Sequence, residues 1–397
     1  MGSKVPSRFG KWMLVKRIGV GASAIVYLAK HEQLGIQVAL KVLRKGLSNR
    51  RPEYAKRFLR EARTAARLEH PNIVRVIDCG IQNGFHYMVM DYVDGQDCKE
   101  MLEAREGGLD WRNATDIVQQ TARGLAHASE KGIVHRDVKP SNIIIDKGGR
   151  ARVTDLGLAK LSIEGAEELT QELHTVGTPN YMSPEQIRSP RHLDIRADIY
   201  SLGATYYHLV TGRPPYIGES PMDVISKHLT ETLTPPSKVL PDLPATLSQV
   251  ISKMMAKSPG RRYQTYDSLQ EDLQNLLHGN RVAALDFRET YTATEEDANF
   301  LKLLDRLSEG AVFEIEEDER PGHTEGLKQG KANATTYIAP FDRSDMAIYA
   351  EPPEEKSTRL AALSESNESP VALVGILVMI GIIIIIAVLL LTFFPSH

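Results

Sequence analysis

The segment His135-Arg-Asp-Val-Lys-Pro-Ser-Asn142, followed by Asp155-Leu-Gly157, holds two aspartates, a lysine and an amide in a fixed order. Phosphoryl transfer needs little covalent help from a protein, but it needs in-line positioning and neutralisation of charge. Asp137 can orient a hydroxyl nucleophile and accept its proton, while Asn142 and Asp155 offer hard oxygen ligands to Mg²⁺. A solvated loop residue is the commoner explanation for any single acid. The ordered set instead predicts phosphoryl transfer.

Two features upstream predict a nucleotide site. In Gly19-Val-Gly-Ala-Ser-Ala-Ile-Val26, the glycines let backbone N–H groups approach phosphate oxygens without a Cβ in the way, although a plain turn between strands gives the same pattern. Lys41, in Val38-Ala-Leu-Lys41, lies amid apolar strand residues, which is costly unless its charge is paired. A snorkelling lysine at a strand end is the alternative. Phosphate oxygens and the carboxylate of Glu61 would pair it.

Together these motifs resemble the eukaryotic-type serine/threonine protein kinase family over about residues 9–277. The elements occur in the family's order, and such an ordered set is highly specific. They are the glycine-rich segment, Val38-Ala-Leu-Lys41, Glu61, His135-Arg-Asp137, Asp155-Leu-Gly157, Ser183-Pro-Glu185, Asp198 and Arg262. The resemblance implies an enzyme that transfers the γ-phosphate of ATP to Ser and Thr hydroxyls of protein substrates.

The resemblance also implies roles for the charged residues of the set. Lys41 would hold the α- and β-phosphates and pair with Glu61. Asp137 would be the catalytic base. Lys139 would contact the γ-phosphate, and the Asp-x-Lys-Pro-x-Asn pattern around it resembles the serine/threonine branch of the family.

The same resemblance implies the metal and adenine sites. Asn142 and Asp155 would bind Mg²⁺, with Mn²⁺ as a second candidate ion. Met90 would be the gatekeeper, and the backbone of residues 91–93 would form the hinge that hydrogen-bonds adenine. The nucleotide-binding residues implied in this way are Gly19, Gly21, Val26, Ala39, Lys41, Met90, Asp91 and Val93.

Three positions depart from the family pattern without removing a required charge. Ala24 replaces the third glycine and adds only a methyl group. Leu156 replaces the Phe of Asp-Phe-Gly, and as a bulky apolar side chain it is expected to pack in its place. Ser183 replaces the Ala of Ala-Pro-Glu. A buried ion pair between Glu185 and Arg262 is implied as scaffold for the C-terminal lobe.

The order of expected elements predicts an α+β fold with two lobes. Strand patterns at 38–43 and 86–93, with a helical pattern at 53–68, predict a β-rich N-lobe at about 9–93. Helical patterns then dominate a C-lobe at about 94–280. The clearest of them span 114–131, 195–211 and 247–256. The kinase resemblance implies the bilobal protein-kinase fold for residues 9–280.

Residues 281–370 differ in charge from the rest of the chain. They hold 10 Lys and Arg against 20 Asp and Glu, whereas residues 1–280 hold 38 basic and 31 acidic residues. Gly, Pro, Ser and Glu are frequent, which is typical of a largely disordered linker. One helix is predicted before the acidic run, because Thr294 and Asp297 resemble a capping box and an apolar face follows. It either packs on the catalytic domain or forms transiently.

Residues 371–394 contain no charge and are rich in Ile, Leu and Val. A helix of this length extends about 36 Å, enough to cross a hydrocarbon core of about 30 Å. A buried core helix is the alternative, but the segment is apolar all round. We therefore expect a single C-terminal transmembrane helix, with residues 395–397 as a short tail. The N-terminal sequence has no apolar signal segment, so the kinase domain is expected to be cytoplasmic at the cell membrane.

Regulation is expected at the activation loop between Asp155 and Glu185. An arginine at the position of Arg136 is often balanced by a phosphate on that loop in the family. Thr175 or Thr170 is the expected site of autophosphorylation, while Thr178 is expected to contact Asp137 and Lys139. Confinement to a membrane would favour a transient homodimer and phosphorylation in trans.

Two other functions remain open at this stage. A membrane-tethered pseudokinase scaffold would share the fold, but such proteins usually lose one of the positions occupied here by Lys41, Asp137 and Asp155. A small-molecule kinase is the second alternative, and Gly177-Thr-Pro-Asn-Tyr-Met-Ser-Pro-Glu185 disfavours it because it resembles a peptide-docking platform. The mildly basic N-terminal part does not by itself indicate nucleic acid as a partner. Bacterial membrane-anchored serine/threonine kinases are the proteins that the whole arrangement resembles.

Overall fold

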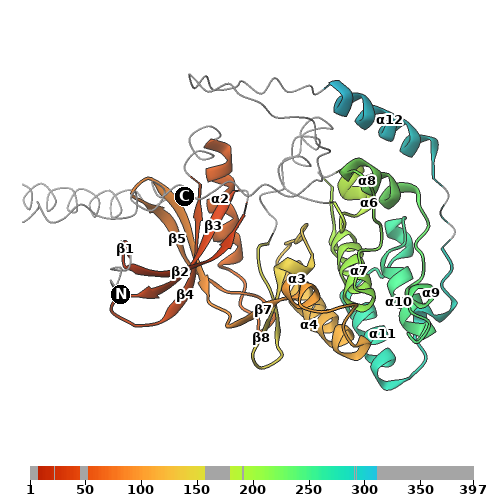
Figure 1. The fold of residues 1–397 in the computed structure, drawn as a ribbon, viewed down its shortest axis with the longest axis horizontal. Helices are drawn as coiled ribbons and strands as arrows, with labels where there is room; N and C mark the ends of the chain where they lie inside the picture. Colours follow the sequence, from red (N-terminus) through yellow and green to blue (C-terminus); the bar gives the residue numbers. More distant parts are fainter. Residues whose placement is uncertain are drawn as a thin grey trace, which may run out of the picture. The chain divides into compact units, whose positions relative to one another are not determined.

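The computed structural model describes most of the first 310 residues (Figure 1). Strands come first along the chain and helices follow, in the order predicted for an α+β fold. The described residues are 8–21, 23–44, 52–156, 179–189, 192–289, 291 and 293–310.

The N-lobe is built on a six-stranded antiparallel sheet in the order β1-β2-β3-β4-β6-β5. Its strands are β1 Arg8–Phe9, β2 Trp12–Val20, β3 Ala24–His31, β4 Gln37–Leu43, β5 Val76–Gln82 and β6 Phe85–Asp91. The predicted strands at 38–43 and 86–93 are confirmed as β4 and β6. The register pairs Lys41 with Val26 on one side and with Met88 on the other, and it pairs Ala39 with Met90.

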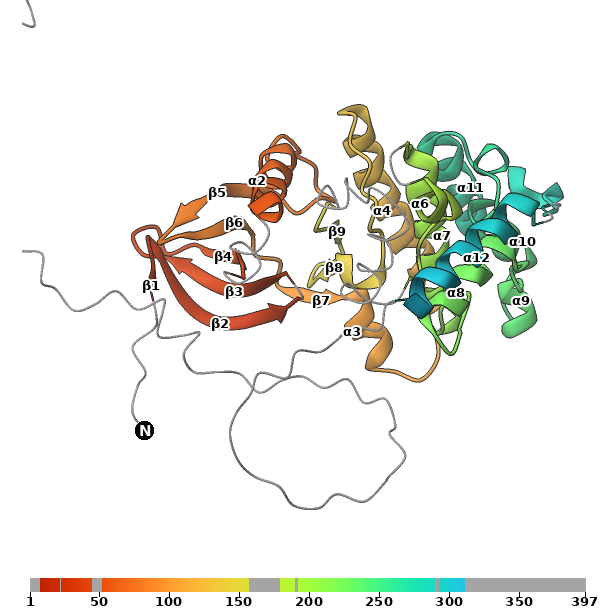
Figure 2. The ribbon, with the colours of Figure 1, turned by 90° about the horizontal axis from the view of Figure 1, so that it is seen from above.

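The helix α2 (Pro52–Ala65) packs against β5 and β6 and confirms the predicted helix at 53–68 (Figure 2). Its side chains Phe58 and Ala62 are buried with the inner face of the sheet. Leu156 joins this cluster and is 5% exposed, so the leucine does pack where the family has phenylalanine. The N-lobe core therefore reaches the segment that carries Asp155.

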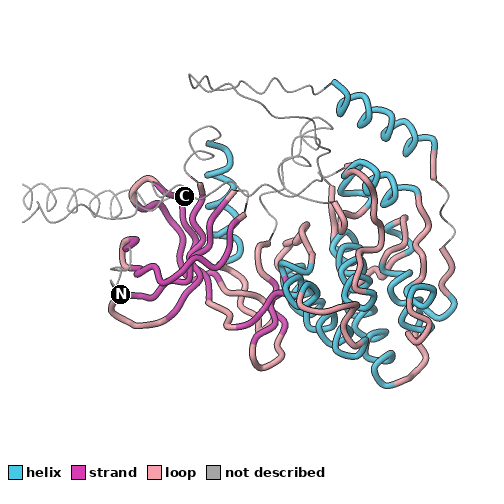
Figure 3. The backbone as a smooth tube through the Cα atoms, viewed as in Figure 1, coloured by secondary structure: helices cyan, strands magenta, loops and turns pink. Residues whose placement is uncertain are grey.

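Helices and one small sheet make up the C-lobe (Figure 3). The sheet has the order β7-β8-β9, with β7 Gly95–Asp97, β8 Ile143–Asp146 and β9 Ala151–Val153. The principal helices are α3 Cys98–Glu103, α4 Trp111–Glu130, α6 Pro184–Arg188, α7 Ile195–Thr211, α8 Pro221–Thr230, α9 Pro236–Val239, α10 Ala245–Met254 and α11 Tyr266–His278. The predicted helices at 114–131, 195–211 and 247–256 are confirmed as α4, α7 and α10.

The helix α7 is the centre of the C-lobe core, and most of its residues are buried. A helix that is apolar nearly all round must be surrounded by other elements. α4 and α10 contact it directly. A Cβ on Gly203 would lie 2.7 Å from the Cβ of Met254, so only glycine allows α7 and α10 to approach this closely.

The chain continues beyond α11 into residues that the sequence predicted to be linker. The short helix η4 (Ala283–Asp286) lies against the C-lobe core, where Val282 and Ala284 are buried. The predicted helix after Thr294 is confirmed as α12 (Glu295–Gly310). Asp297 N–H donates to Thr294 Oγ1 over 3.2 Å, and Thr294 N–H donates to Asp297 Oδ2 over 2.9 Å, which completes the capping box.

Within the described part of the chain, no helix combines the length and the apolar character needed to cross a bilayer. The predicted span at 371–394 lies outside those residues, as does most of the predicted linker.

Candidate active site

The loop between α4 and β8 carries His135, Arg136 and Asp137, and one buried carboxylate holds its backbone. Asp198 of α7 accepts hydrogen bonds from the N–H groups of His135 over 2.7 Å and Arg136 over 2.8 Å. Its side chain is 2% exposed, and burial raises the pKa of Asp198. Arg136 has a φ of 65°, a conformation that non-glycine residues rarely adopt. A strained loop of this kind persists only where its surroundings hold it.

Asp137, Lys139 and Asn142 converge within this loop. Lys139 Nζ lies 2.9 Å from Asp137 Oδ2. The amide nitrogen of Asn142 donates to the backbone carbonyl of Asp137 over 2.8 Å and to its Oδ2 over 3.1 Å. Because that nitrogen donates to Asp137, the amide oxygen is the atom of the Asn142 side chain that can act as a metal ligand.

Asp155 lies beside this loop, at the end of the β9 strand. The two segments are joined by the N–H of Thr154, which donates to the carbonyl of Asn142 over 3.0 Å, and by His135 Nε2, which lies 3.0 Å from the carbonyl of Thr154. Asp155 has a φ of 54°. Its Oδ1 accepts a hydrogen bond from Lys41 Nζ over 2.7 Å, so a side chain of the N-lobe sheet reaches the loops of the C-lobe.

The expected ion pair between Lys41 and Glu61 is not among the contacts of the described residues. Among the described residues, the ion pair recorded for Lys41 is the one with Asp155. Glu61 is 8% exposed, and burial raises its pKa to about 7, although the charge of Lys41 acts to lower it. The ammonium of Lys41 attracts both carboxylates, and the pKa of Lys41 is raised by these neighbours even though burial acts to lower it.

The predicted nucleotide-binding residues lie along β2, β3, β4 and β6. Gly19 pairs with Val26 in the register of β2 and β3, and the N–H of Gly21 donates to the carbonyl of Ala24 over 2.9 Å. Val26 packs at the margin of the N-lobe core, next to Ala39 and Met90. These side chains therefore share one apolar face.

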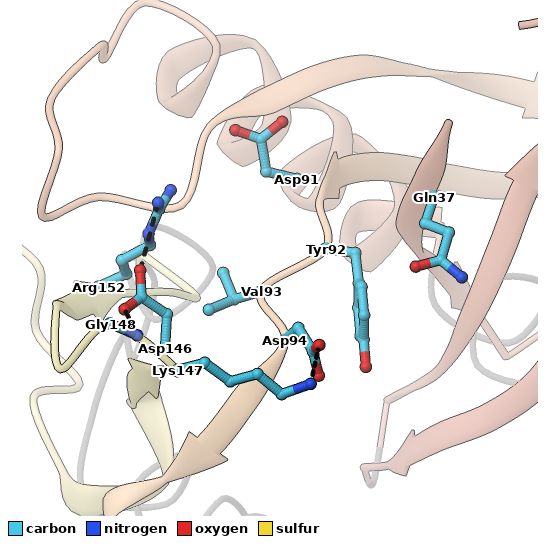
Figure 4. Close-up of a pocket in the computed structure, with 9 residues that line it drawn as sticks. All are labelled: Gln37, Asp91, Tyr92, Val93, Asp94, Asp146, Lys147, Gly148 and Arg152. Carbon is cyan, nitrogen blue, oxygen red and sulfur yellow. Dashed lines mark hydrogen bonds and ion pairs between the residues drawn. The ribbon is translucent and has the colours of Figure 1, made fainter. Parts of the chain in front are cut away.

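A pocket of about 410 Å³ lies beside the predicted hinge (Figure 4). Its lining includes residues 91–94 and the turn at 146–148. Its carboxylates are paired, since Lys147 contacts Asp94 and Arg152 contacts Asp146. The lining contains predicted hinge residues but none of the catalytic loop, so it flanks the candidate active site and does not include it.

Next to the catalytic loop, α6 carries Glu185, one member of the predicted scaffold pair. Arg262 is fully buried, and its two terminal nitrogens lie 2.6 Å and 2.8 Å from the carboxylate oxygens of Glu185. The prediction of this ion pair is confirmed. Gln186, the next residue on α6, donates from Nε2 to the carbonyl of Arg136 over 2.7 Å. α6 thus contacts the loop that carries Asp137.

Two contacts were missed from the sequence. The sequence indicated Asp198 only as part of a motif. Its hydrogen bonds to the backbone of residues 135–136 are a feature of the tertiary structure. Gln186 gave no signal, since a glutamine after Pro-Glu is an ordinary helical residue. Thr170, Thr175, Thr178 and Gly157 lie outside the described residues, so the expectations for them remain predictions.

Comparison with known proteins agrees with this geometry. A family model described as the protein kinase domain matches residues 12–273, which is more than half of the chain. The chain belongs to the protein kinase family. Two curated relatives of this kinase are the serine/threonine-protein kinases PknB of Mycolicibacterium smegmatis, 39% identical over 273 residues, and PrkC of Bacillus subtilis, 37% identical over 273 residues.

These matches cover 68% and 69% of the kinase chain but only 43% and 41% of the two relatives, so the chain spans less than half of their length. Among solved structures, the kinase domain of Mycobacterium tuberculosis PknI superposes with a TM-score of 0.55 at 30% identity. That match covers 69% of this kinase chain and 99% of the PknI domain. The bilobal kinase fold is therefore established for this part of the chain.

Proposed function

We propose that this kinase transfers the γ-phosphate of ATP to Ser and Thr hydroxyls of proteins. One observation carries the proposal: the catalytic loop, the Asp155 segment and strand β4 bring together two ammonium groups, two carboxylates and an amide, each in hydrogen-bonding contact with at least one of the others. Lys139 lies 2.9 Å from Asp137, and Lys41 lies 2.7 Å from Asp155. A site that neutralises and aligns phosphates needs such groups preorganised in one place.

The donor set fits a magnesium ion shared with a nucleotide. Asn142 presents an amide oxygen and Asp155 a carboxylate that is 37% exposed. No group of three or more His, Cys, Asp or Glu side chains among the described residues could hold a metal by itself. Mg²⁺ typically takes one or two protein oxygens and completes its shell with phosphate oxygens and water. When bound, the ion would neutralise the phosphate charge; Mn²⁺ has compatible chemistry.

The adenine site would lie at the hinge. Ala39, Val26 and Met90 present one apolar face on adjacent strands, which suits a flat aromatic ring. Within the described residues, no recorded backbone hydrogen bond uses the N–H of Val93, whereas that of Asp91 donates to the carbonyl of Arg75 over 3.0 Å. Val93 would therefore donate to the adenine edge. Gly19 and Gly21 would let the β2–β3 turn approach the phosphates.

The proposed step assigns one task to each polar residue. Asp137 orients the substrate hydroxyl and accepts its proton as the oxygen attacks the γ-phosphorus, while the bond from that phosphorus to the β,γ-bridging oxygen breaks and ADP leaves. Lys139, already paired with Asp137, turns to the transferred phosphoryl group. Lys41 moves from Asp155 to the α- and β-phosphates and to Glu61, which frees Asp155 for the metal. The family requires that lysine–glutamate pair in the active state.

A radiolabel assay tests the proposal. Purified full-length protein is supplied with γ-³²P-ATP, Mg²⁺ and a generic basic protein, and Asp155→Asn serves as the inactive control. We expect label on Ser and Thr of the substrate with the wild type only. Binding of ATP without any transfer would instead support the pseudokinase scaffold, and label on a small-molecule acceptor alone would support the remaining alternative.

We also propose autophosphorylation of the activation loop. The Nε and Nη1 atoms of Arg136 are buried without a hydrogen-bond partner within the described residues, and burial lowers the pKa of this guanidinium. A phosphate would supply the missing acceptors. Mass spectrometry of active protein should find phosphate on Thr175 or Thr170, and Asp137→Ala protein should lack it. Unmodified loop peptides in both samples would refute the idea.

Finally, we propose that residues 371–394 anchor the kinase domain to the cytoplasmic face of the cell membrane, where transient homodimers form. The support is the uncharged apolar sequence itself. Wild-type protein should stay in the membrane pellet after a high-salt wash, and Ile382→Arg with Ile384→Arg should release it. Retention of both proteins, or release of both, would contradict the proposed span. Mixing active protein with an Asp137→Ala acceptor would test phosphorylation in trans.

A further inference from the structure

The short helix α6 contacts both the catalytic loop and the buried Arg262. Gln186 donates to the carbonyl of Arg136, the residue before the catalytic base, over 2.7 Å. Glu185 is paired with the buried Arg262. α6 has only five residues, and a helix of this length cannot hold its own position in water. Its placement, and that of the loop it contacts, must come from the elements packed against it.

The second charged contact of α6 is made by residues beyond the family-matched region, which ends at 273. Arg188 Nε donates to Asp297 Oδ1 over 2.6 Å, and its Nη2 donates to the hydroxyl of Tyr291 over 2.8 Å. That hydroxyl also contacts Asp297, and Thr294 donates to Asp297 from both N and Oγ1 over 2.9 Å. The side chain of Asp297 is fully buried. A buried carboxylate with this many donors is a specific attachment point.

An apolar contact lies next to this ion pair. Phe300 and Leu301 of α12 pack against a small core formed by α6 and α8. Ile187 of α6 is 1% exposed, and Ile225 and Leu229 of α8 are fully buried. The two views of Figures 1 and 2 agree in placing α12 along α8. The helix α12 thus extends the folded C-lobe, and it contacts the lobe through both a polar and an apolar group of residues.

We propose that Asp297 is a positioning residue for phosphotransfer: by holding Arg188, it fixes α6, and α6 holds the catalytic loop through Gln186. The inference rests on the proposed function and adds that Tyr291 and residues 293–303 belong to the catalytic unit. Without the carboxylate of Asp297, the half-buried guanidinium of Arg188 would lose its charged partner. Arg188 then turns toward water, and α6 loses one of its two ion pairs while keeping the one with Arg262.

The test uses the full chain with Asp297→Asn, which keeps the shape of the side chain and removes its charge. Glu295→Gln is the matched control, since Glu295 is an exposed acid in the first turn of the same helix. Turnover is normalised to the number of nucleotide-binding sites, so that loss of folded protein is not counted as loss of catalysis. We expect kcat to fall about tenfold in Asp297→Asn, with KM for ATP unchanged. Tyr291→Phe, a milder change, should lower kcat less.

Hydrogen exchange supplies a readout that does not depend on activity. In Asp297→Asn, amides of residues 184–189 and 135–142 should exchange about tenfold faster than in the wild type, while those of α11 should not change. Unchanged exchange in the catalytic loop, or an unchanged or raised kcat, would overturn the proposal; a raised kcat would make α12 an inhibitory segment. If Asp297→Asn shows the faster exchange but the wild type transfers no phosphate, the proposed function is wrong, whereas the attachment of α6 by Asp297 is still supported.

Discussion

The Nζ atom of Lys41 lies 2.7 Å from Oδ1 of Asp155, and this ion pair joins strand β4 of the N-lobe to the segment after β9. The two residues are 114 positions apart in the chain. Lys41 is 16% exposed and Asp155 is 37% exposed, so the contact is partly shielded from water. In the proposed transfer step, Lys41 would leave Asp155 for the phosphates and Glu61, and Asp155 would then hold the metal.

Lys41→Met should abolish most of the phosphotransfer while leaving the fold intact. Methionine retains the apolar stem in the sheet but removes the only ammonium recorded in contact with Asp155 among the described residues. Loss of one preorganised electrostatic partner typically costs about 10² to 10³ in kcat. Radiolabel transfer checks the rate, and circular dichroism checks the fold. Lys147→Met, at an exposed pair with Asp94, is the control and should behave as the wild type; equal rates for both variants would contradict the role of Lys41.

Glu61 should make stability depend on pH in a defined window. Burial raises its pKa from 4.5 to about 7, so between these values the folded state binds a proton that the unfolded state has lost. The resulting stabilisation is fully present below about pH 4.5 and is lost as the pH rises toward 7. Urea denaturation at several pH values should show this decline in the wild type. In Glu61→Gln the contribution should be absent, and identical pH profiles for the two proteins would contradict it.

The buried pair of Glu185 and Arg262 should matter far more than an exposed pair. Glu185→Ala leaves a fully buried guanidinium without its carboxylate, which typically costs about 3–5 kcal/mol of unfolding free energy. Asp286→Ala is the matched control, because Asp286 pairs with Arg281 at 3.0 Å with both side chains mostly exposed. Thermal unfolding should show a large loss for the first variant and almost none for the second. Similar losses would contradict the argument from burial.

Gly203→Ala should destabilise the C-lobe by overpacking. The added Cβ would meet the Cβ of Met254 at 2.7 Å and the Cγ of Met255 at 2.9 Å. Such overpacking typically costs about 1–3 kcal/mol. Gly260→Ala is the control, since its nearest atom would lie 3.9 Å away, and a lower entropy of the unfolded chain makes it neutral or stabilising. Chemical denaturation of both variants measures the difference, and a neutral Gly203→Ala would show that α7 and α10 can separate.

The sequence alone determined the element order and the composition of the candidate site. Strand β4 and helices α4, α7 and α10 follow from local periodicity, and the capping box at Thr294 and Asp297 follows from residues three apart. Asp137, Asn142 and Asp155 were identified because their spacing is short and their chemistry is shared. Such patterns can be read from the sequence because they depend only on residues that are close together in the chain.

Apart from the pair of Glu185 with Arg262, which the family resemblance implied, the tertiary structure decided which charged groups meet. The sequence favoured Glu61 as the partner of Lys41, but the packing of α2 and of the Asp155 segment brings Asp155 closer. The contact of Asp297 with Arg188 joins residues 109 apart, and the hold of Asp198 on His135 joins residues 63 apart. The strength of a hydrogen bond changes when the donor–acceptor distance shifts by a few tenths of an ångström. Such distances are set by the packing of whole helices and sheets. No local pattern in the sequence carries that information.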